Sequence, residues 1–290
     1  MSPPMKASKM FMQPRRRGPL PKCALLAALA FTPPVFAQTP EAPALWEVGA
    51  LGVGLRQQAY PGSSQEIGRS FVLPYFVYRG QYWRADEGNI GLRAVKTDRL
   101  ELDIGFAGAF GSNSNEVDAR NGMPDLGTLF EFGPKLKWYL GDVTKKDGWR
   151  AELALRGVFD ISDKLRDKGV SLEPELVYTA RLHDGWRYGA SMGLVFGDQR
   201  LTDTFYGVAP VYATAIRPAY SAQSGLIMTR LSLNVSRAIT PEISIFSFAR
   251  WATLEGAGNG GSPLVRQNNA TALGVGLSYT LAKSTERAPR

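Results

Sequence analysis

The sequence has very little cysteine and histidine: its 290 residues include one of each. Cys23 lies in an N-terminal segment that we expect to be removed on export, which leaves the mature chain without cysteine. Disulfide bonds, thiol catalysis and cysteine-based metal sites are thereby excluded. A zinc site needs several histidine or cysteine ligands, and His183 alone cannot form one. We therefore predict neither a metal nor any other cofactor.

The single histidine also limits the possible enzymes. His183 stands in a short His-Asp-Gly turn, where it could act as a general base with Asp184. A lone histidine in a turn is far more often a solvated turn residue. A membrane hydrolase would instead need serine and histidine facing outward on adjacent strands. We predict that the protein is not an enzyme, with a carboxylate-based activity on lipid or murein as the remaining enzymatic alternative.

Excess positive charge is confined to the start of the chain. The net charge is +8, but residues 1–37 contain six basic residues and no acidic one, so the remainder has 28 basic and 26 acidic residues. The basic character therefore belongs to this N-terminal segment and not to a nucleic-acid-binding surface. We predict no nucleic-acid partner.

Long apolar runs are also missing. The longest one near the N-terminus, 23–31, follows a cluster of arginines and is about half of the roughly 20 residues that a membrane-spanning helix needs. A transmembrane anchor is therefore the weaker interpretation. Val35-Phe36-Ala37 is typical of a small-residue cleavage site, so we predict a signal peptide over 1–37 that is cut between Ala37 and Gln38. A short lead, 38–44, follows it.

Alternation of apolar and polar residues dominates the rest of the chain, as expected for β-strands with one face in lipid. In segment 149–160, for example, Trp149, Leu153 and Leu155 lie on one face and Arg150 and Glu152 on the other. A soluble β-sandwich also alternates, but these segments run 10 to 14 residues, against a usual 5 to 6 in soluble sheets. The clearest segments are 99–110, 129–140, 149–160, 170–182, 186–197 and 271–281.

Three further segments, 45–56, 81–93 and 199–206, are less regular strand candidates. The whole pattern predicts an all-β fold over 45–281: a closed antiparallel transmembrane β-barrel of about 12 strands, with 10 or 14 possible. A polar tail, 282–290, follows the barrel. The expected partners of such a barrel are outer-membrane lipid and the outer-membrane assembly machinery.

The connections between these segments alternate between short and long, as is typical of outer-membrane β-barrels. Short ones are 141–147 and 183–185, and long ones are 111–124, 206–224 and 256–269. Tryptophan and tyrosine near segment ends predict an aromatic girdle at a membrane interface. Its candidate members are Trp46, Tyr78, Trp138, Tyr139, Trp149, Trp186 and Tyr279.

The polar faces carry many charges of both signs. One interpretation is a charged constriction for solutes or a paired-carboxylate site. The other is cross-strand ion pairing that fills a narrow lumen, and the mixed signs favour it. The candidate lumen-facing residues are Glu101, Asp103, Glu131, Lys135, Lys137, Arg150, Glu152, Arg156, Glu173, Glu175, Arg181, Arg187 and Arg230.

Several short motifs occur in order along the mature chain. They are Ala59-Tyr60-Pro61-Gly62-Ser63, Leu73-Pro74-Tyr75-Phe76-Val77-Tyr78-Arg79-Gly80, residues 122–134 (GMPDLGTLFEFGP), Phe205-Tyr206-Gly207-Val208, Pro218-Ala219-Tyr220-Ser221-Ala222 and Gly261-Ser262-Pro263-Leu264-Val265. In these motifs the chain resembles the MltA-interacting protein family, also called the MipA/OmpV family of outer-membrane proteins. One departure is the polar tail, since such barrels typically end on an aromatic residue; Tyr279 is the candidate substitute.

The resemblance implies an outer-membrane scaffold that holds a lytic transglycosylase near a murein synthase at the cell envelope of a Gram-negative bacterium. Because none of the motifs is catalytic, it does not identify a chemistry. The charged inner face and the long loops leave a small channel or a solute-binding barrel as the alternative function.

Overall fold

The computed structural model describes a single chain of the protein. The predicted signal peptide, its cleavage site at Ala37 and Gln38, most of the lead and His183 lie outside the described residues. The described residues are 43–80, 83–86, 89–97, 99–109, 111–141, 147–182 and 184–288.

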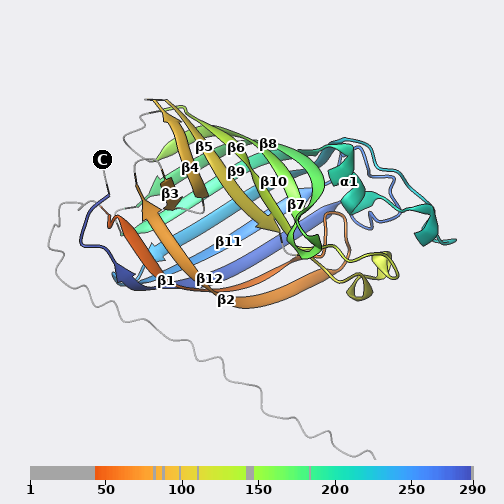
Figure 1. Ribbon diagram of the computed structural model, residues 1–290, viewed down its shortest axis with the longest axis horizontal. Helices are drawn as coiled ribbons and strands as arrows, with labels where there is room; N and C mark the ends of the chain where they lie inside the picture. The colour runs from red at the N-terminus through yellow and green to blue at the C-terminus, as the bar shows by residue number, and fades with distance from the viewer. Residues whose placement is uncertain are drawn as a thin grey trace, which may run out of the picture. The chain divides into compact units, whose positions relative to one another are not determined.

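The described part of the chain contains twelve antiparallel strands (Figure 1). Each strand pairs with the next, and β1 also pairs with β12, so the ladder returns to its start. The prediction of an all-β antiparallel fold is confirmed. The strands are β1 (Trp46–Gln58), β2 (Glu66–Arg79), β3 (Trp83–Asp86), β4 (Asn89–Lys96), β5 (Leu100–Ala109), β6 (Leu129–Tyr139), β7 (Gly148–Asp160), β8 (Arg166–Arg181), β9 (Trp186–Gly197), β10 (Gly225–Ala238), β11 (Ile243–Thr253) and β12 (Asn269–Lys283).

The pairing between strands in the barrel wall is least extensive between β2 and β5. Segment 81–93 was expected to be one strand, but it contains β3 and the first part of β4. β3 pairs with β2 only at Tyr78 and Arg79, and β4 pairs with β5 only as far as Gly105. Along the rest of β2, no further ladder to β3 is present in the described chain. Among the described residues, the ring is joined on this side through the short strand pair β3 and β4.

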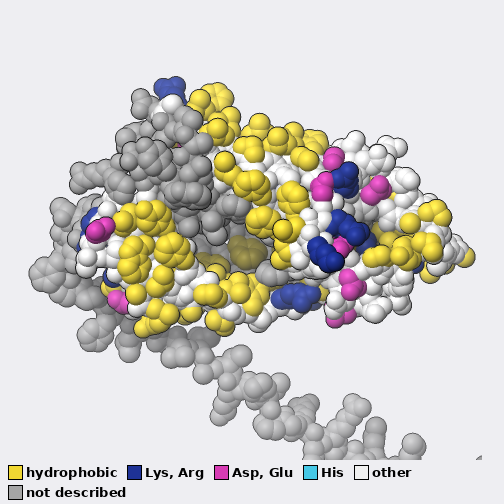
Figure 2. Space-filling model, in the orientation of Figure 1, with side chains coloured by type: hydrophobic (Ala, Val, Ile, Leu, Met, Phe, Trp, Pro, Cys, Tyr) yellow, Lys and Arg dark blue, Asp and Glu magenta, His cyan; other side chains and the backbone are white. Residues whose placement is uncertain are grey.

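Outward-facing side chains are largely apolar. Along β6, Leu136 and Trp138 are exposed while Lys137 between them is buried, because successive side chains on a strand point to opposite faces. Val72 on β2 and Val275 on β12 are 74% and 63% exposed. Figure 2 shows hydrophobic side chains over the strands, whereas charged ones gather toward the end that carries α1.

The two ends of the barrel differ. At the short-turn end, the Ser284 hydroxyl accepts a hydrogen bond from the Leu45 N–H, so the two described ends of the chain meet there. Outward aromatic rings also gather at this end, where those of Trp149 and Tyr178 lie 5.0 Å apart. Tyr139 was predicted to belong to the girdle, and this prediction is wrong. It pairs with Arg150 in the ladder and shares the inward face of β6 with Lys137.

The other end, the long-loop end, carries the long connections and α1 (Gln199–Tyr206). Segment 199–206 was expected to be a strand, and that prediction is wrong. The carboxylate of Asp198 accepts a hydrogen bond from the Leu201 N–H at 2.9 Å and caps the helix, which outweighs the weak alternation. Short 3-10 helices lie at Ser114–Glu116, Asp118–Arg120, Ile161–Asp163 and Pro210–Tyr212. Within the described residues, no helix has the length and apolar character needed to cross a membrane.

Candidate functional site: the barrel interior

Six inward charges on β5, β6 and β7 form what we call the turn-side cluster: Glu101, Asp103, Lys135, Lys137, Arg150 and Glu152. Lys137 Nζ lies 3.2 Å from Glu101 and 2.5 Å from Asp103. Arg150 Nε donates to Glu152 at 2.6 Å, and Lys135 also pairs with Glu152. Three acids and three bases therefore neutralise one another across three strands.

These charges are screened from water. Glu101, Lys137 and Glu152 are 6%, 7% and 5% exposed. A water-filled lumen would leave the inward side chains accessible, so at this level the interior is packed with side chains. Buried charges of this kind are tolerated only when each has its partner.

A second group, the loop-side cluster, consists of Glu131, Arg156, Glu173, Glu175, Arg230 and Arg250 on β6, β7, β8, β10 and β11. Arg156 lies 3.0 Å from Glu173 and 3.4 Å from Glu131. Arg230 lies 2.8 Å from Glu173 and 3.8 Å from Glu175. Glu173 is thus the centre of this cluster, bonded to two arginines at once.

Two of the thirteen predicted lumen residues lie outside both clusters. Arg181 is the last residue of β8; its side chain is 44% exposed and lies 3.5 Å from Asp147. Arg187, the second residue of β9, is also exposed. Both stand at the short-turn rim and not deep inside, because the alternation pattern gives the face of a strand position but not its depth.

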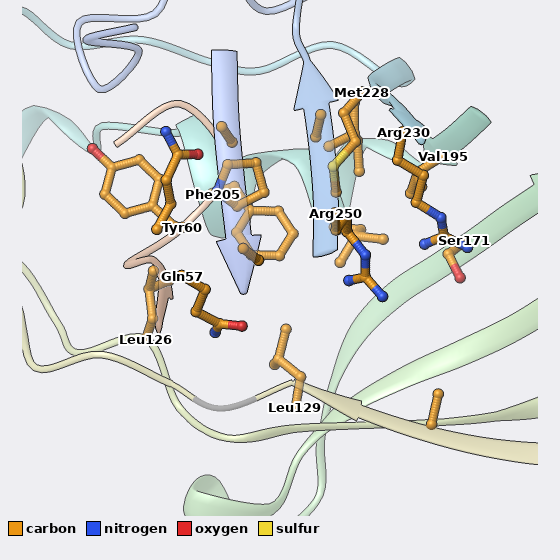
Figure 3. Close-up of a pocket in the computed structure, with 18 of the residues that line it drawn as sticks. Gln57, Tyr60, Leu126, Leu129, Ser171, Val195, Phe205, Met228, Arg230 and Arg250 are labelled. Carbon is orange, nitrogen blue, oxygen red and sulfur yellow. The ribbon is translucent and has the colours of Figure 1, made fainter. Parts of the chain in front are cut away.

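The loop-side cluster borders a cavity of about 390 Å³ at the long-loop end (Figure 3). Its charged lining is Arg156, Arg230, Arg250, Glu131 and Glu173, and its largest apolar side chains come from β6, β9, β10, α1 and the loops. The apolar lining includes Tyr60, Leu126, Leu129, Val195, Leu201, Phe205, Ile227, Met228 and Leu254. Charged and apolar walls therefore face one space.

Arg250 is the functional candidate that the sequence predictions missed. It shares the inward face of β11 with Phe246 and Phe248, whose ladder partners are Gly276 and Gly274. The signal in the sequence was weak, since the inward positions of this strand are otherwise mostly aromatic or small. Arg250 has no hydrogen bond or ion pair among the described residues.

The cavity lies beneath a cap formed by the long loops. The Tyr60 hydroxyl donates to the Leu264 carbonyl oxygen at 2.7 Å, and both residues pack with Met123 and Val208 in one buried cluster. Burial raises the pKa of Tyr60 to about 12. Arg120 lies over the Tyr60 ring, 5.7 Å from its centroid, and burial lowers the pKa of this guanidinium.

Buried arginine also ties the loops to each other. Arg217 Nη1 donates to the carbonyl oxygens of Ala119 and Asn121 at 3.1 and 2.9 Å. The Ser262 hydroxyl donates to the Tyr206 carbonyl oxygen at 2.7 Å. Five of the six short motifs noted in the sequence thus meet in space at the cap, although each alone suggested only a turn or a strand. The sixth, 73–80, lies at the end of β2 toward the short-turn end.

The described residues contain no group of histidine, cysteine or carboxylate side chains suited to a metal ion. What they define is an antiparallel β-barrel with an ion-paired interior and a capped cavity at one end. A family model described as "MltA-interacting protein MipA" matches residues 49–281, and the chain belongs to this family. A search of curated proteins found no match.

Solved structures resemble the chain only distantly. The NanC porin is 13% identical with a TM-score of 0.39, and the match covers 80% of this chain and all of that one. The translocator domain of the autotransporter NalP from Neisseria meningitidis is 9% identical with a TM-score of 0.41 and coverages of 83% and 89%. A FadL homologue of Pseudomonas aeruginosa is 10% identical with a TM-score of 0.36 and coverages of 82% and 68%. Likenesses at this level carry no functional argument.

Proposed function

We propose that the protein is a non-enzymatic outer-membrane barrel that anchors murein-processing enzymes at the cell envelope. The support for the membrane is the outward face, where large apolar side chains such as Val72, Leu233 and Val275 are exposed on strand after strand. A water-soluble monomer rarely exposes a continuous apolar surface of this extent. Export by a cleaved signal peptide belongs to the same proposal.

The buried ion-pair network of the turn-side cluster is the observation that favours an anchor over a pore. The inward charges on the neighbouring strands β5, β6 and β7 neutralise one another and are largely buried, whereas a selective pore would present charges of one sign to water. The surface left for a partner is then the rim at the short-turn end, which short turns assign to the periplasm. The family description, an interacting protein of MltA, supports a murein enzyme as that partner.

Rim charges provide a direct test. In intact cells, a C-terminally tagged barrel is cross-linked and purified, after fractionation has established its presence in the outer membrane. A rim variant, Arg187→Glu with Arg237→Glu, is compared with a loop-end variant, Arg166→Glu with Arg200→Glu. Arg187 and Arg237 lie at the short-turn end, where Arg237 pairs with Trp186 in the ladder. Arg166 begins β8 and Arg200 lies in α1, both at the long-loop end, so each variant reverses two arginines at one end of the barrel.

We expect a lytic transglycosylase or a murein synthase to co-purify with the wild type and the loop-end variant but not with the rim variant. Recovery of the wild-type barrel alone, or only with assembly factors, contradicts the scaffold. Loss of the enzymes in both variants contradicts the assignment of the rim as the docking side.

The cavity favours a second candidate, a solute-binding or channel protein. Its combination of arginine and apolar lining is what a binding site for a small molecule requires. Reconstitution in planar bilayers distinguishes a channel from a solute-binding protein. Single-channel current steps favour a channel, and their absence favours solute binding without conduction.

A further inference from the structure

We infer that the cavity beneath the cap binds a small organic monoanion, a carboxylate on an apolar body, and that Arg250 holds the carboxylate beside Arg230. The inference concerns the long-loop end and is independent of the scaffold role assigned to the opposite rim.

Arg250 and Arg230 are neighbours on adjoining strands. Arg250 pairs with Ser232 in the ladder between β10 and β11, so Arg230, two residues away, points to the same face. Figure 3 shows both guanidinium groups directed into the cavity. Their surroundings differ, because Arg230 is bonded to Glu173 whereas Arg250 has no ion pair within the described part of the chain.

The Arg250 guanidinium is open to the cavity and has no ion pair among the described residues, so an incoming carboxylate can pair with it without breaking another ion pair. Arg250 is exposed, and it points into the cavity, so its free donors face the space that a ligand would occupy. Arginine presents N–H groups in a planar fork that matches both oxygens of a carboxylate. Arg156, on the same lining, adds a buried Nε–H without a partner among the described residues.

The carboxylates around the arginines favour a ligand with a single negative charge. Three arginines and two glutamates line the cavity, and Glu175, 3.8 Å from Arg230, brings the loop-side cluster to three charges of each sign. Arg250 has no ion pair among the described residues, so one carboxylate matches it, whereas the second charge of a dianion such as phosphate would lie among these glutamates.

The remaining lining selects an apolar body. The ring of Phe205 and the side chains of Leu129 and Met228 face the same space as the arginines (Figure 3). A volume of about 390 Å³ is at the lower end of the range for small-molecule pockets. A carboxylate with one ring or a short hydrocarbon chain fits this description.

Calorimetric titration of the full barrel in detergent tests the inference, with detergent-only titrations subtracted. Three probes are compared: 4-phenylbutyrate, the uncharged 4-phenylbutan-1-ol, and inorganic phosphate. We expect saturable binding of the carboxylate and at least about tenfold weaker binding of the alcohol and of phosphate, since loss of a charged hydrogen-bonded partner typically costs this much or more.

Two variants and one control locate the site. Arg250→Gln removes the free guanidinium, and we expect the dissociation constant of 4-phenylbutyrate to rise about tenfold or more. Ala272→Phe places a ring beside Arg250, its ladder partner, and we expect a similar loss without any change in charge. Arg187→Gln removes the same charge at the opposite rim, and we expect less than about a twofold change.

Each outcome is decisive once the barrels are seen to fold, by their heat-modifiable migration on gels. The inference is overturned if the wild type shows no saturable binding or if the alcohol binds as tightly as the carboxylate. Tighter binding of phosphate would overturn the monoanion class. Equal effects of Arg250→Gln and Arg187→Gln would reduce the binding to unspecific attraction and would also reject the site.

Discussion

The turn-side and loop-side clusters each contain three acidic and three basic side chains and lie on neighbouring stretches of the same barrel. In the turn-side cluster, Lys137 and Glu152 each have two partners of opposite charge and are almost wholly buried. In the loop-side cluster, Glu173 is equally buried, but Arg250 is exposed to a cavity and has no partner among the described residues. In the turn-side cluster every charge has a partner, whereas the unpaired Arg250 beside the cavity is the feature on which the inferred binding site rests.

The largest expected effect is in the turn-side cluster. Lys137→Met would leave Glu101 and Asp103 buried without their shared cation, and breaking a buried pair in this way typically costs about 3–5 kcal/mol. We expect the free energy of unfolding, measured by denaturant titration in phospholipid vesicles, to fall by that amount. Lys135→Met is the matched control with a smaller expected loss, because Glu152 keeps Arg150. Equal losses would contradict the role of Lys137 as the shared cation.

The next effect concerns the centre of the loop-side cluster. Glu173→Gln removes the charge that holds both Arg156 and Arg230, but Glu131 and Glu175 remain near them. We expect a loss of about 2–3 kcal/mol, between that of Lys137→Met and that of a peripheral pair. In Glu175→Gln the substituted residue has, among the described residues, a single ion pair 3.8 Å long, so this change should cost less than about 1 kcal/mol. A larger loss in Glu175→Gln than in Glu173→Gln would reverse this order.

A pH-dependent effect separates the cap from the strands. The folded-state pKa of Tyr60 is raised to about 12 from an ordinary value near 10, so its neutral hydroxyl stabilises the cap at pH values below 10. This contribution is lost as the pH rises from 10 through 12. We expect hydrogen exchange of the amides in 59–65 and 259–265 to accelerate over this range while strand amides stay protected. Tyr60→Phe should remove the part of this acceleration that is due to Tyr60; an unchanged profile would show that Tyr60 is not its source.

Much of the barrel wall could be predicted from the sequence, because a side-chain period of two is a local property. The faces of β7 follow directly from the alternation of Trp149, Arg150, Ala151 and Glu152. The same alternation places the charged residues of this strand on the inward face. Local periodicity does not report depth along the barrel, which is why Arg181 and Arg187 at the rim were grouped with deeply buried residues.

The cap and the cavity could not be predicted, since they depend on contacts between distant segments. Tyr60 and Leu264 are 204 residues apart, and their hydrogen bond has no local signature. The helix α1 was not predicted either, because the weak alternation over 199–206 does not reveal that the Asp198 carboxylate accepts a hydrogen bond from the Leu201 N–H and caps a helix there. Arg250 was missed because one charge on an otherwise aromatic face looks like an exception until the cavity in front of it is known.

The smallest expected effect is the one that most sharply separates the two clusters. Arg250→Gln removes a charge as Lys137→Met does, but it breaks no ion pair among the described residues. We therefore expect the free energy of unfolding to change by less than about 1 kcal/mol, or to increase slightly, because an unpaired cation near Arg230 is removed. Measured together with the binding titration, the variant should keep its stability and lose its affinity. A loss of stability comparable to that of Lys137→Met would mean that Arg250 is a structural member of the ion-pair network. The proposed difference between a fully paired cluster and a binding site would then be refuted.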